Sequence, residues 1–205
     1  MPKDWRKEQS RDKYFQQAKR EGYRARSAYK LIELNERYKL IRAGMTILDL
    51  GAAPGSWSQV AAQLGARVVA VDLSPIQPLA GVTTIRGDIT KPETLAQITS
   101  ALSGNADLVM SDVAPATSGI HLVDHARSIE LARASLELAI RFLKNDGKFV
   151  VKVFQGEDFE AFVKETRQYF RQVSIHRPPA SRSESREQYV VGVGFRRKEN
   201  HKTIE

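Results

Sequence analysis

One glycine-rich turn constrains this chain more than any other feature. It occupies residues 49–57 and reads DLGAAPGSW. The apolar run before it, residues 45–48, predicts a buried strand, and the segment after it, residues 58–64, predicts a helix. A strand that ends in glycines and continues as a helix leaves free backbone N–H groups and a positive helix end over an open crevice. The turn therefore predicts a site for a nucleotide-like cofactor.

The turn departs from the dinucleotide-binding fingerprint at one position. That fingerprint places a second glycine two residues after the first, so that the backbone can approach a pyrophosphate. Here the residue two after Gly51 is Ala53, and Pro54 follows it. A tight loop without a diphosphate cradle favours an adenosine cofactor that lacks phosphates, of which S-adenosylmethionine is the common one. An NAD-dependent oxidoreductase is correspondingly disfavoured.

Length and composition set outer bounds. A chain of 205 residues is long enough for one domain with a sizeable core, and we expect a single domain over residues 1–205. The sequence contains no cysteine, which excludes a disulfide scaffold and a cysteine-ligated zinc site. Mean hydropathy is -0.40, and no apolar segment is long enough to span a membrane. The charged N-terminus lacks the apolar core of a signal peptide, so we expect a cytoplasmic protein.

The positive charge gathers at the N-terminus. The net charge is +8, and residues 1–30 carry ten Lys or Arg against four acids, a net +6. Five aromatic residues are interleaved with these charges: Trp5, Tyr14, Phe15, Tyr23 and Tyr29. Basic groups bind phosphates and aromatic rings stack on bases, so we predict that residues 1–26 form an RNA-binding arm. The alternative is a solvated, poorly ordered tail, for which so many aromatic residues would have little use.

The rest of the chain alternates between two patterns. Residues 27–38 carry apolar residues at helical spacing, as do residues 58–64, 92–102, 124–143 and 159–170. Short apolar runs that predict strands occupy residues 45–50, 66–73, 82–85, 107–110, 147–153, 173–175 and 189–195. Strands that alternate with helices predict an α/β fold with a parallel sheet covered on both faces. No helical pattern separates the last two runs, so we expect them to form an antiparallel pair.

Three successive strands are each followed by an acid. In open parallel sheets, ligands bind outside the carboxyl ends of the strands. Asp72 lies about 20 residues beyond the glycine turn, where a carboxylate binds ribose hydroxyls. Asp88 follows the next run and suits the amino group of an adenine, and Asp112 follows the run after that. One acid at a strand end is explained by turn chemistry, whereas three at successive ends indicate a ligand site.

Together these motifs resemble the FtsJ/RrmJ (RlmE) family of ribosomal RNA large-subunit 2'-O-ribose methyltransferases. The resemblance runs from about residue 12 to residue 195. The residues that carry it are DLGAAPGSW, VDL at 71–73, GDI at 87–89, SDVAP at 111–115 and VKVFQG at 151–156. Ser56 stands where the family often has a second glycine.

The resemblance implies a fold and an activity. The fold is a Rossmann-like S-adenosylmethionine-dependent methyltransferase fold: a seven-stranded, mostly parallel sheet with one antiparallel strand and helices on both faces. The activity is 2'-O-methylation of a uridine in 23S-type ribosomal RNA near the peptidyl-transferase centre, with the large ribosomal subunit as substrate. We also expect a monomer. No metal ion is expected, because the acids are assigned to ribose, adenine and lysine.

The resemblance also implies a catalytic tetrad, which falls on Lys30, Asp112, Lys152 and Glu187. With the first glycine of the turn added, the predicted cofactor contacts are Gly51, Gly55, Trp57, Asp72, Asp88 and Asp112. From the residues alone, Lys152 stands out, because a lysine inside an apolar strand either snorkels or points into a site. Lys30 alone would be taken for a phosphate contact, and Glu187 alone for a loop carboxylate.

Two questions stay open at this stage. Lys152 is the candidate base or hydroxyl-orienting group, with Asp112 orienting it. Burial and Lys30 favour its neutral form, whereas the two acids favour its charged form. The alternative functions are a transfer RNA or cap 2'-O-methyltransferase and a catalytically silent RNA-binding protein. The short chain favours the ribosomal enzyme, and a silent protein would be expected to have lost the tetrad.

Overall fold

The computed structural model describes residues 12–115, 118–181 and 185–197. In this part of the chain, the strands form a seven-stranded sheet in the order β3-β2-β1-β4-β5-β7-β6. They are β1 (Thr46–Leu50), β2 (Arg67–Asp72), β3 (Val82–Arg86), β4 (Ala106–Ser111), β5 (Leu143–Phe154), β6 (Phe170–His176) and β7 (Glu187–Phe195). Strands β1 to β5 pair in parallel, whereas β7 runs antiparallel to both β5 and β6. The predicted mostly parallel sheet with one reversed strand is confirmed.

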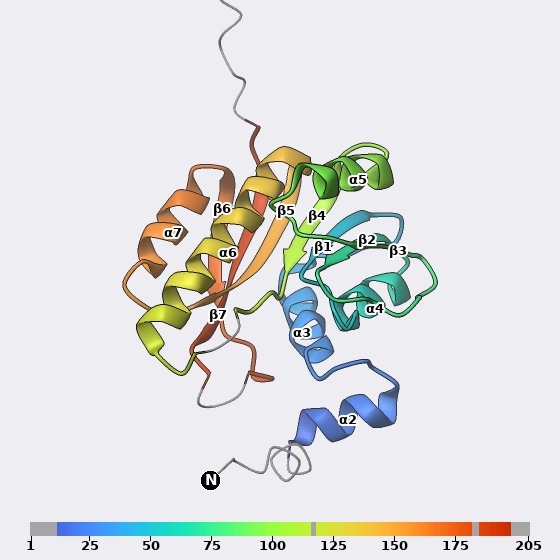
Figure 1. Ribbon diagram of the computed structural model, residues 1–205, viewed down its shortest axis with the longest axis horizontal. Coiled ribbons are helices and arrows are strands. Elements are labelled where there is room, and N and C mark those ends of the chain that lie inside the picture. The colour runs from blue at the N-terminus through green and yellow to red at the C-terminus, as the bar shows by residue number, and fades with distance from the viewer. Residues whose placement is uncertain (1–11, 116–117, 182–184, 198–205) are drawn as a thin grey trace, which may run out of the picture.

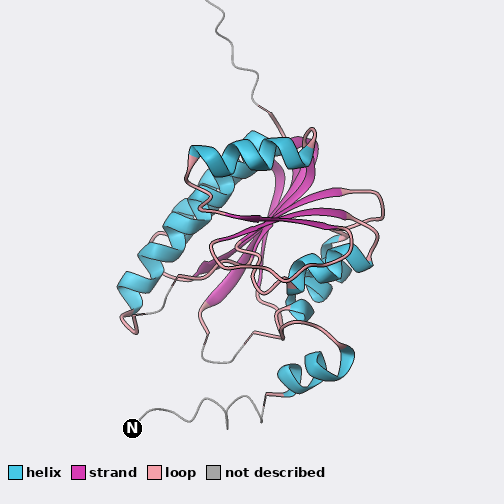
Figure 2. Cartoon of the chain, turned by 45° about the vertical axis from the view of Figure 1, so that its right-hand side comes forward, coloured by secondary structure: helices cyan, strands magenta, loops and turns pink. Residues whose placement is uncertain are grey.

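Helices cover both faces of the sheet (Figure 2). They are α2 (Lys13–Glu21), α3 (Ala28–Tyr38), α4 (Ser56–Gln63), α5 (Pro92–Leu102), α6 (His121–Phe142) and α7 (Phe159–Arg167). One buried cluster joins alternate strand residues such as Leu48 and Val69 to α5, α6 and α7. A second cluster joins the residues between them, such as Ile47 and Val68, to α3 and α4. Successive residues of a strand face opposite sides of the sheet. Because helices cover both sides, a central strand is buried on both of its faces, which explains the continuous apolar runs in the sequence.

The central and edge strands differ as this packing requires. Residues 68–71 of β2 are buried throughout, because the strand lies between β1 and β3 and under helices on both sides. In the edge strand β3, Thr83 and Thr84 are exposed and Ile85 alone is buried. In the described part of the chain, no helix combines the length and the apolar character needed to cross a membrane.

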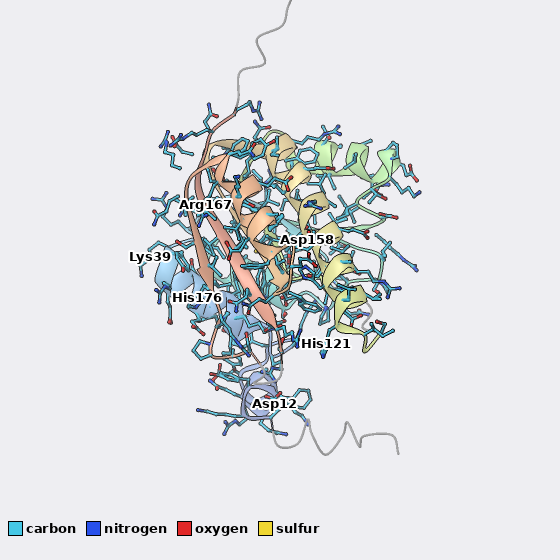
Figure 3. The ribbon with its side chains drawn as sticks, turned by 90° about the vertical axis from the view of Figure 1, so that its left-hand side faces the viewer. Asp12, Lys39, His121, Asp158, Arg167 and His176 are labelled. Atoms are coloured by element: carbon cyan, nitrogen blue, oxygen red, sulfur yellow. The ribbon has the colours of Figure 1, made fainter. Side chains whose placement is uncertain are left out.

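Helix α2 lies apart from the sheet, at the end toward which the arrowhead of β4 points (Figure 1). Asp12 caps it by accepting bonds from the backbone N–H groups of Tyr14 and Phe15, both at 3.1 Å. Gly22 ends it in the left-handed conformation, with φ at 75°. Figure 3, in which Asp12 is labelled, shows this helix projecting beyond the rest of the described fold. Residues 1–11 of the predicted arm, including Trp5, lie outside the described residues.

Candidate active site

The carboxyl ends of β4 and β5 bring Asp112 and Lys152 together. Asp112 directly follows β4. Lys152 lies near the carboxyl end of β5, which pairs with β4 in parallel. The Lys152 ammonium donates to the backbone oxygen of Asp112 at 2.6 Å and lies 3.0 Å from its Oδ1. The Lys152 side chain is only 8 % exposed. A lysine buried to this degree requires a partner of opposite charge, and Asp112 supplies it.

The other two tetrad positions form a second ion pair beside the first. Lys30 lies on the buried face of α3, and Glu187 is the first residue of β7, opposite Phe154 of β5. Lys30 Nζ and Glu187 Oε1 are 2.5 Å apart. The structure therefore gathers residues from four distant parts of the chain at one edge of the sheet. Which of them takes part in a reaction remains a prediction.

Tyr189 connects the two ion pairs and was not among the predicted site residues. Its hydroxyl donates to Asp112 Oδ1 at 2.5 Å, and Lys30 Nζ lies 5.9 Å from the centre of its ring. Tyr189 is fully buried and packs against Trp57, with ring centres 5.7 Å apart. The available signal was its spacing: residues two apart in a strand share a face, so Tyr189 follows Glu187 into the site.

The charges of the cluster follow from these contacts. Burial acts to raise the pKa of Asp112, but the charges of Lys152 and Lys30 and the bond from Tyr189 outweigh it, and the pKa is lowered. Burial likewise opposes ionisation of Glu187, and the neighbouring Lys30 lowers its pKa overall. Burial, followed by the charge of Asp112, raises the pKa of Tyr189 well above its ordinary value. At neutral pH the site therefore holds two carboxylates and a neutral phenol.

A cavity of about 130 Å³ lies beside the glycine turn. Its walls come from the end of β2, from the loops after β1, β2, β3 and β4, and from α6. The residues are Gly51, Val71, Asp72, Leu73, Gly87, Asp88, Ile89, Thr90, Val113, Leu131 and Ala134. A Cβ on Gly51 would lie 2.6 Å from the Cβ of Val113, and Gly51 has φ +68°. Only glycine fits this position without displacing the wall. Val113 directly follows Asp112 in the chain, but Asp112 itself, a predicted cofactor contact, is not among the described residues that line the cavity.

Two predicted cofactor acids, Asp72 and Asp88, line this cavity. Asp72 accepts bonds from the backbone N–H groups of Ala53 at 2.9 Å and Ser74 at 2.7 Å. Asp88 accepts from the backbone N–H and the hydroxyl of Thr90, and these bonds lower its pKa. Asp88 is thus held in place by its own loop, whereas Asp72 is held by its own loop and by the turn after β1. A carboxylate has about four acceptor positions, so both retain capacity for a ligand.

Gly55 and Trp57 are not among the described residues that line the cavity. Gly55 precedes α4 with φ at 101°, a conformation that favours glycine. Trp57 is 2 % exposed, and its indole N–H donates to the backbone oxygen of Ser27 at 2.9 Å. The structure places both residues where they shape the turn, and their contact with a cofactor remains a prediction.

The sequence profile of the FtsJ-like methyltransferase family matches residues 23–195. The match covers all seven strands and both ion pairs of the cluster. This chain belongs to the FtsJ-like methyltransferase family. As an FtsJ-like methyltransferase, it has S-adenosylmethionine as its expected methyl donor.

Relatives and solved structures agree with this assignment. The FtsJ-like chain is 56 % identical over 186 residues to Ribosomal RNA large subunit methyltransferase E of Archaeoglobus fulgidus, covering 91 % of this chain and 97 % of the relative. The protein of the same name from Methanothermobacter thermautotrophicus is 46 % identical over 209 residues, covering 100 % and 99 %. A crystal structure described as a ribosomal RNA methyltransferase from Plasmodium falciparum matches with a TM-score of 0.76 and 27 % identity, covering 84 % of this chain and 98 % of that one.

The described residues of this FtsJ-like methyltransferase contain no group of three or more His, Cys, Asp or Glu side chains arranged to hold a metal ion. The acids of the site have other partners: Asp112 contacts Lys152, and Glu187 contacts Lys30. Asp72 accepts a bond from Ala53 in the turn after β1, and Asp88 accepts bonds from Thr90 in its own loop. The donor set present is therefore one of lysines, paired carboxylates and backbone groups.

Proposed function

We propose that this FtsJ-like methyltransferase transfers a methyl group from S-adenosylmethionine to the ribose 2'-hydroxyl of a uridine in 23S-type ribosomal RNA, within the large ribosomal subunit. Relatives named Ribosomal RNA large subunit methyltransferase E align over nearly the whole chain and support the substrate class. The observation that carries the chemistry is the placement of Lys152 beside Asp112, the residue that directly precedes Val113 of the cavity wall.

The cavity fits an adenosine cofactor in three respects. Gly51 leaves the space that a side chain would fill. Asp72 and Asp88 offer carboxylate oxygens, which suit the hydroxyls of a ribose and the amino group of an adenine. The apolar side chains of Ile89 and Leu131 provide walls for a flat base. When bound, S-adenosylmethionine supplies a methyl group on a positively charged sulfonium, which is already a good leaving group.

The chain must then align the acceptor hydroxyl and assist the loss of its proton. The Lys152 nitrogen has three positions besides its carbon stem. Two of them are directed at the backbone oxygen and the carboxylate of Asp112. The third is left for the substrate, and it is an N–H when Lys152 is charged and a lone pair when Lys152 is neutral. In the charged form it orients the hydroxyl and stabilises the developing alkoxide. In the neutral form it accepts the hydroxyl proton as a base.

The other members of the cluster hold Lys152 in this geometry. Asp112 fixes the ammonium from two sides and is itself fixed by the Tyr189 hydroxyl. Lys30 adds a second positive charge. Glu187 balances this charge and holds the Lys30 ammonium in place. Alignment of reacting groups is worth several kcal/mol, and a well-placed base adds about 10²–10⁴-fold to a rate. Both contributions depend on a rigid site, which these buried ion pairs provide.

Mass-spectrometric mapping of ribose methylation tests the proposal most directly. Ribosomal RNA from cells with and without this protein should differ by one 2'-O-methyluridine in the large subunit. The purified protein should restore that methyl group on large subunits from the deletion strain. Restoration on transfer RNA or on a capped RNA would identify the related activity of the same superfamily instead. An unchanged methylation map and no transfer to any RNA would indicate a silent RNA-binding protein.

A further inference from the structure

Residues 22–27 join α2 to α3, and we call this segment the arm root. It lies against the glycine turn that precedes α4. Arg24 is one of the ten basic residues that suggested an RNA-binding arm, yet its guanidinium is directed at protein. Arg24 Nη1 donates to the backbone oxygens of Pro54 at 3.0 Å and Gln77 at 2.9 Å, and Nη2 donates to that of Pro78 at 2.8 Å. Three of its five N–H donors are thus committed to backbone carbonyls.

These carbonyls belong to two loops that carry predicted cofactor residues. Pro54 lies in the turn after β1, between Ala53 and Gly55, and residues 77–78 lie in the loop after β2. The Ala53 N–H donates to Asp72, which ends β2 and lines the cavity. Arg24 therefore joins the two loops from the outside, while the bond from Ala53 to Asp72 joins them from the inside. A Cβ on Gly55 would lie 2.7 Å from Arg24 Nη1, which shows how closely the guanidinium covers the turn.

The rest of the arm root is fastened to the first turns of α4. The backbone N–H of Arg24 donates to Gln59 Oε1 at 3.0 Å, and Gln59 Nε2 donates to the oxygen of Gly22 at 2.9 Å. The hydroxyls of Ser27 and Ser56 are 2.7 Å apart. The indole of Trp57 donates to the oxygen of Ser27. Contacts at both ends and in the middle of the segment hold it against the cofactor turn.

We propose that Arg24 is a positioning residue of the cofactor site and not part of the RNA contact surface. The inference rests on the proposed use of S-adenosylmethionine. A guanidinium presents several N–H groups in a fixed plane and can bridge three carbonyls, whereas a lysine ammonium is a single compact donor group. The Arg24→Lys variant therefore keeps the charge and loses the bridge. Because a preorganised site binds more tightly, loosening the two loops weakens cofactor binding.

The test is calorimetric titration of S-adenosylmethionine into the full chain, for wild type, Arg24→Lys and Arg67→Lys. Arg67 is the matched control, because its guanidinium also bridges backbone oxygens, those of Ala101 and Leu102, but from the first residue of β2. We expect Arg24→Lys to weaken binding about tenfold and Arg67→Lys to leave it unchanged. In turnover, Arg24→Lys should raise the KM for the cofactor by a similar factor, with little change in kcat at saturation.

RNA binding separates positioning from phosphate contact. The Arg24→Gln variant removes the charge, so the salt dependence of RNA affinity should still equal that of wild type if Arg24 contacts no phosphate. Where Arg24→Lys does not fold, the Gln59→Ala variant takes its place. It removes the two bonds that the Gln59 side chain makes to the arm root and should also weaken cofactor binding.

Four outcomes would overturn the proposal. The first is equal cofactor affinity in wild type and Arg24→Lys, and the second is an equal loss of affinity in Arg24→Lys and Arg67→Lys. The third is a shallower salt slope of RNA affinity in Arg24→Gln. The fourth, where Arg24→Lys does not fold, is unchanged cofactor affinity in Gln59→Ala. Absence of S-adenosylmethionine binding by the wild type would instead contradict the proposed function.

Discussion

Lys152 occupies a position that a lysine rarely takes, because it belongs to a strand whose two faces are both covered and its side chain is buried. Its stem adjoins Val151 and Val153, which are fully buried, and its ammonium is held by Asp112. The cost of burying the ammonium is offset by two charge-assisted contacts, which also fix its direction. A buried lysine held in this way, beside the residue that precedes Val113 of the cavity wall, is expected to act on a ligand.

Replacement of Lys152 by alanine should abolish methyl transfer and leave cofactor affinity nearly intact, because its proposed role begins at the ribose hydroxyl. Single-turnover assays and calorimetry measure the two effects. The Lys148→Ala variant is the matched control. Lys148 lies four residues earlier in β5 and donates to the oxygen of Lys39, away from the site. Glu187→Gln should reduce the rate less than Lys152→Ala. A Lys152→Ala enzyme that kept most of its rate would contradict the assignment.

Asp49 is a buried acid outside the tetrad, and it makes the stability of the fold depend on pH. It is 1 % exposed, and the Ser58 hydroxyl donates to it at 2.6 Å. Burial is the main cause that raises its pKa from 3.8 to about 7, with the charges of Asp112 and Asp72 adding to it and the bond from Ser58 opposing it. The folded state therefore holds a proton that the unfolded state has lost at intermediate pH. The associated stability is fully present below the unfolded pKa and is lost as pH rises through the folded pKa.

The Asp49→Asn variant removes this titration. Relative to wild type, its free energy of unfolding should rise by about 2 kcal/mol between about pH 5 and about pH 8. Denaturant unfolding of both proteins at the two pH values measures the change, and the comparison cancels the groups that both proteins share. A difference between the variants that stays constant with pH would show that Asp49 titrates in the native state as it does in the unfolded chain.

At the scale of the elements, apolar periodicity predicted most of the sheet. Every predicted strand overlaps an observed one, and residues 92–102 match α5 at both ends. The boundaries of β5 and β6 were missed, because both strands continue through polar residues such as Lys144 and Arg171 that periodicity excludes. Helix α2 was missed for a different reason. Its residues are mainly polar and Ala18 alone is buried, so it has too few apolar residues to be recognised as a helix that packs on the core.

The site was predictable only in part from the residues alone. Asp72, Asp88 and Asp112 follow strands, and the topology of parallel sheets brings strand ends together whatever the sequence between them. Lys30 and Glu187 required the family pattern, since their pairing joins α3 to β7 across most of the chain. Tyr189 escaped both approaches. A tyrosine in an apolar strand is compatible with the core, and only the three-dimensional structure shows its hydroxyl directed at Asp112.

The loops after β1 and β2 act together, and Asp72 is the group that joins them at the cavity. We expect Asp72→Ala to weaken S-adenosylmethionine binding by about 1–3 kcal/mol, because it removes a partner of buried donors. Calorimetry measures the loss. Asp107→Ala is the matched control: Asp107 also accepts from a backbone N–H, that of Thr46 at 2.7 Å, but near the first residue of β4. Equal affinity for wild type and Asp72→Ala would contradict the proposed cofactor site.

At the scale of the whole molecule, the arm and the site lie at the same end of the sheet. Figure 1 shows α2 beyond the end toward which β4 points, and the arm root connects it to the helix that carries Lys30. Two aromatic residues of the arm pack on Tyr29 of α3: the ring of Tyr29 lies 5.5 Å from that of Tyr14 and 5.6 Å from that of Tyr23. The Tyr29 hydroxyl also donates to Glu21. These residues attach α2 to the fold, so the charge of the arm is its main proposed means of binding RNA.

Removal of residues 1–21 tests the arm while sparing the arm root. The cut leaves the Gly22 carbonyl to accept its bond from Gln59 and leaves Arg24 on its three carbonyls. Cofactor affinity should therefore match that of the full chain. RNA affinity should fall sharply and its salt dependence should flatten, because each phosphate that is no longer neutralised lowers the log–log slope by about 0.7–0.9.

Binding of a large-subunit ribosomal RNA fragment across a salt series, with calorimetry of the cofactor alongside, measures both effects. The RNA affinities of the two proteins should converge at high salt, where the electrostatic contribution disappears for both. Lys30 and Lys152 remain in the truncated chain, so transfer should persist when substrate is in excess. If RNA affinity and its salt slope were unchanged, RNA would be inferred to bind at the loop before β7 and not at the arm. Arg177 and Arg186 lie in that loop.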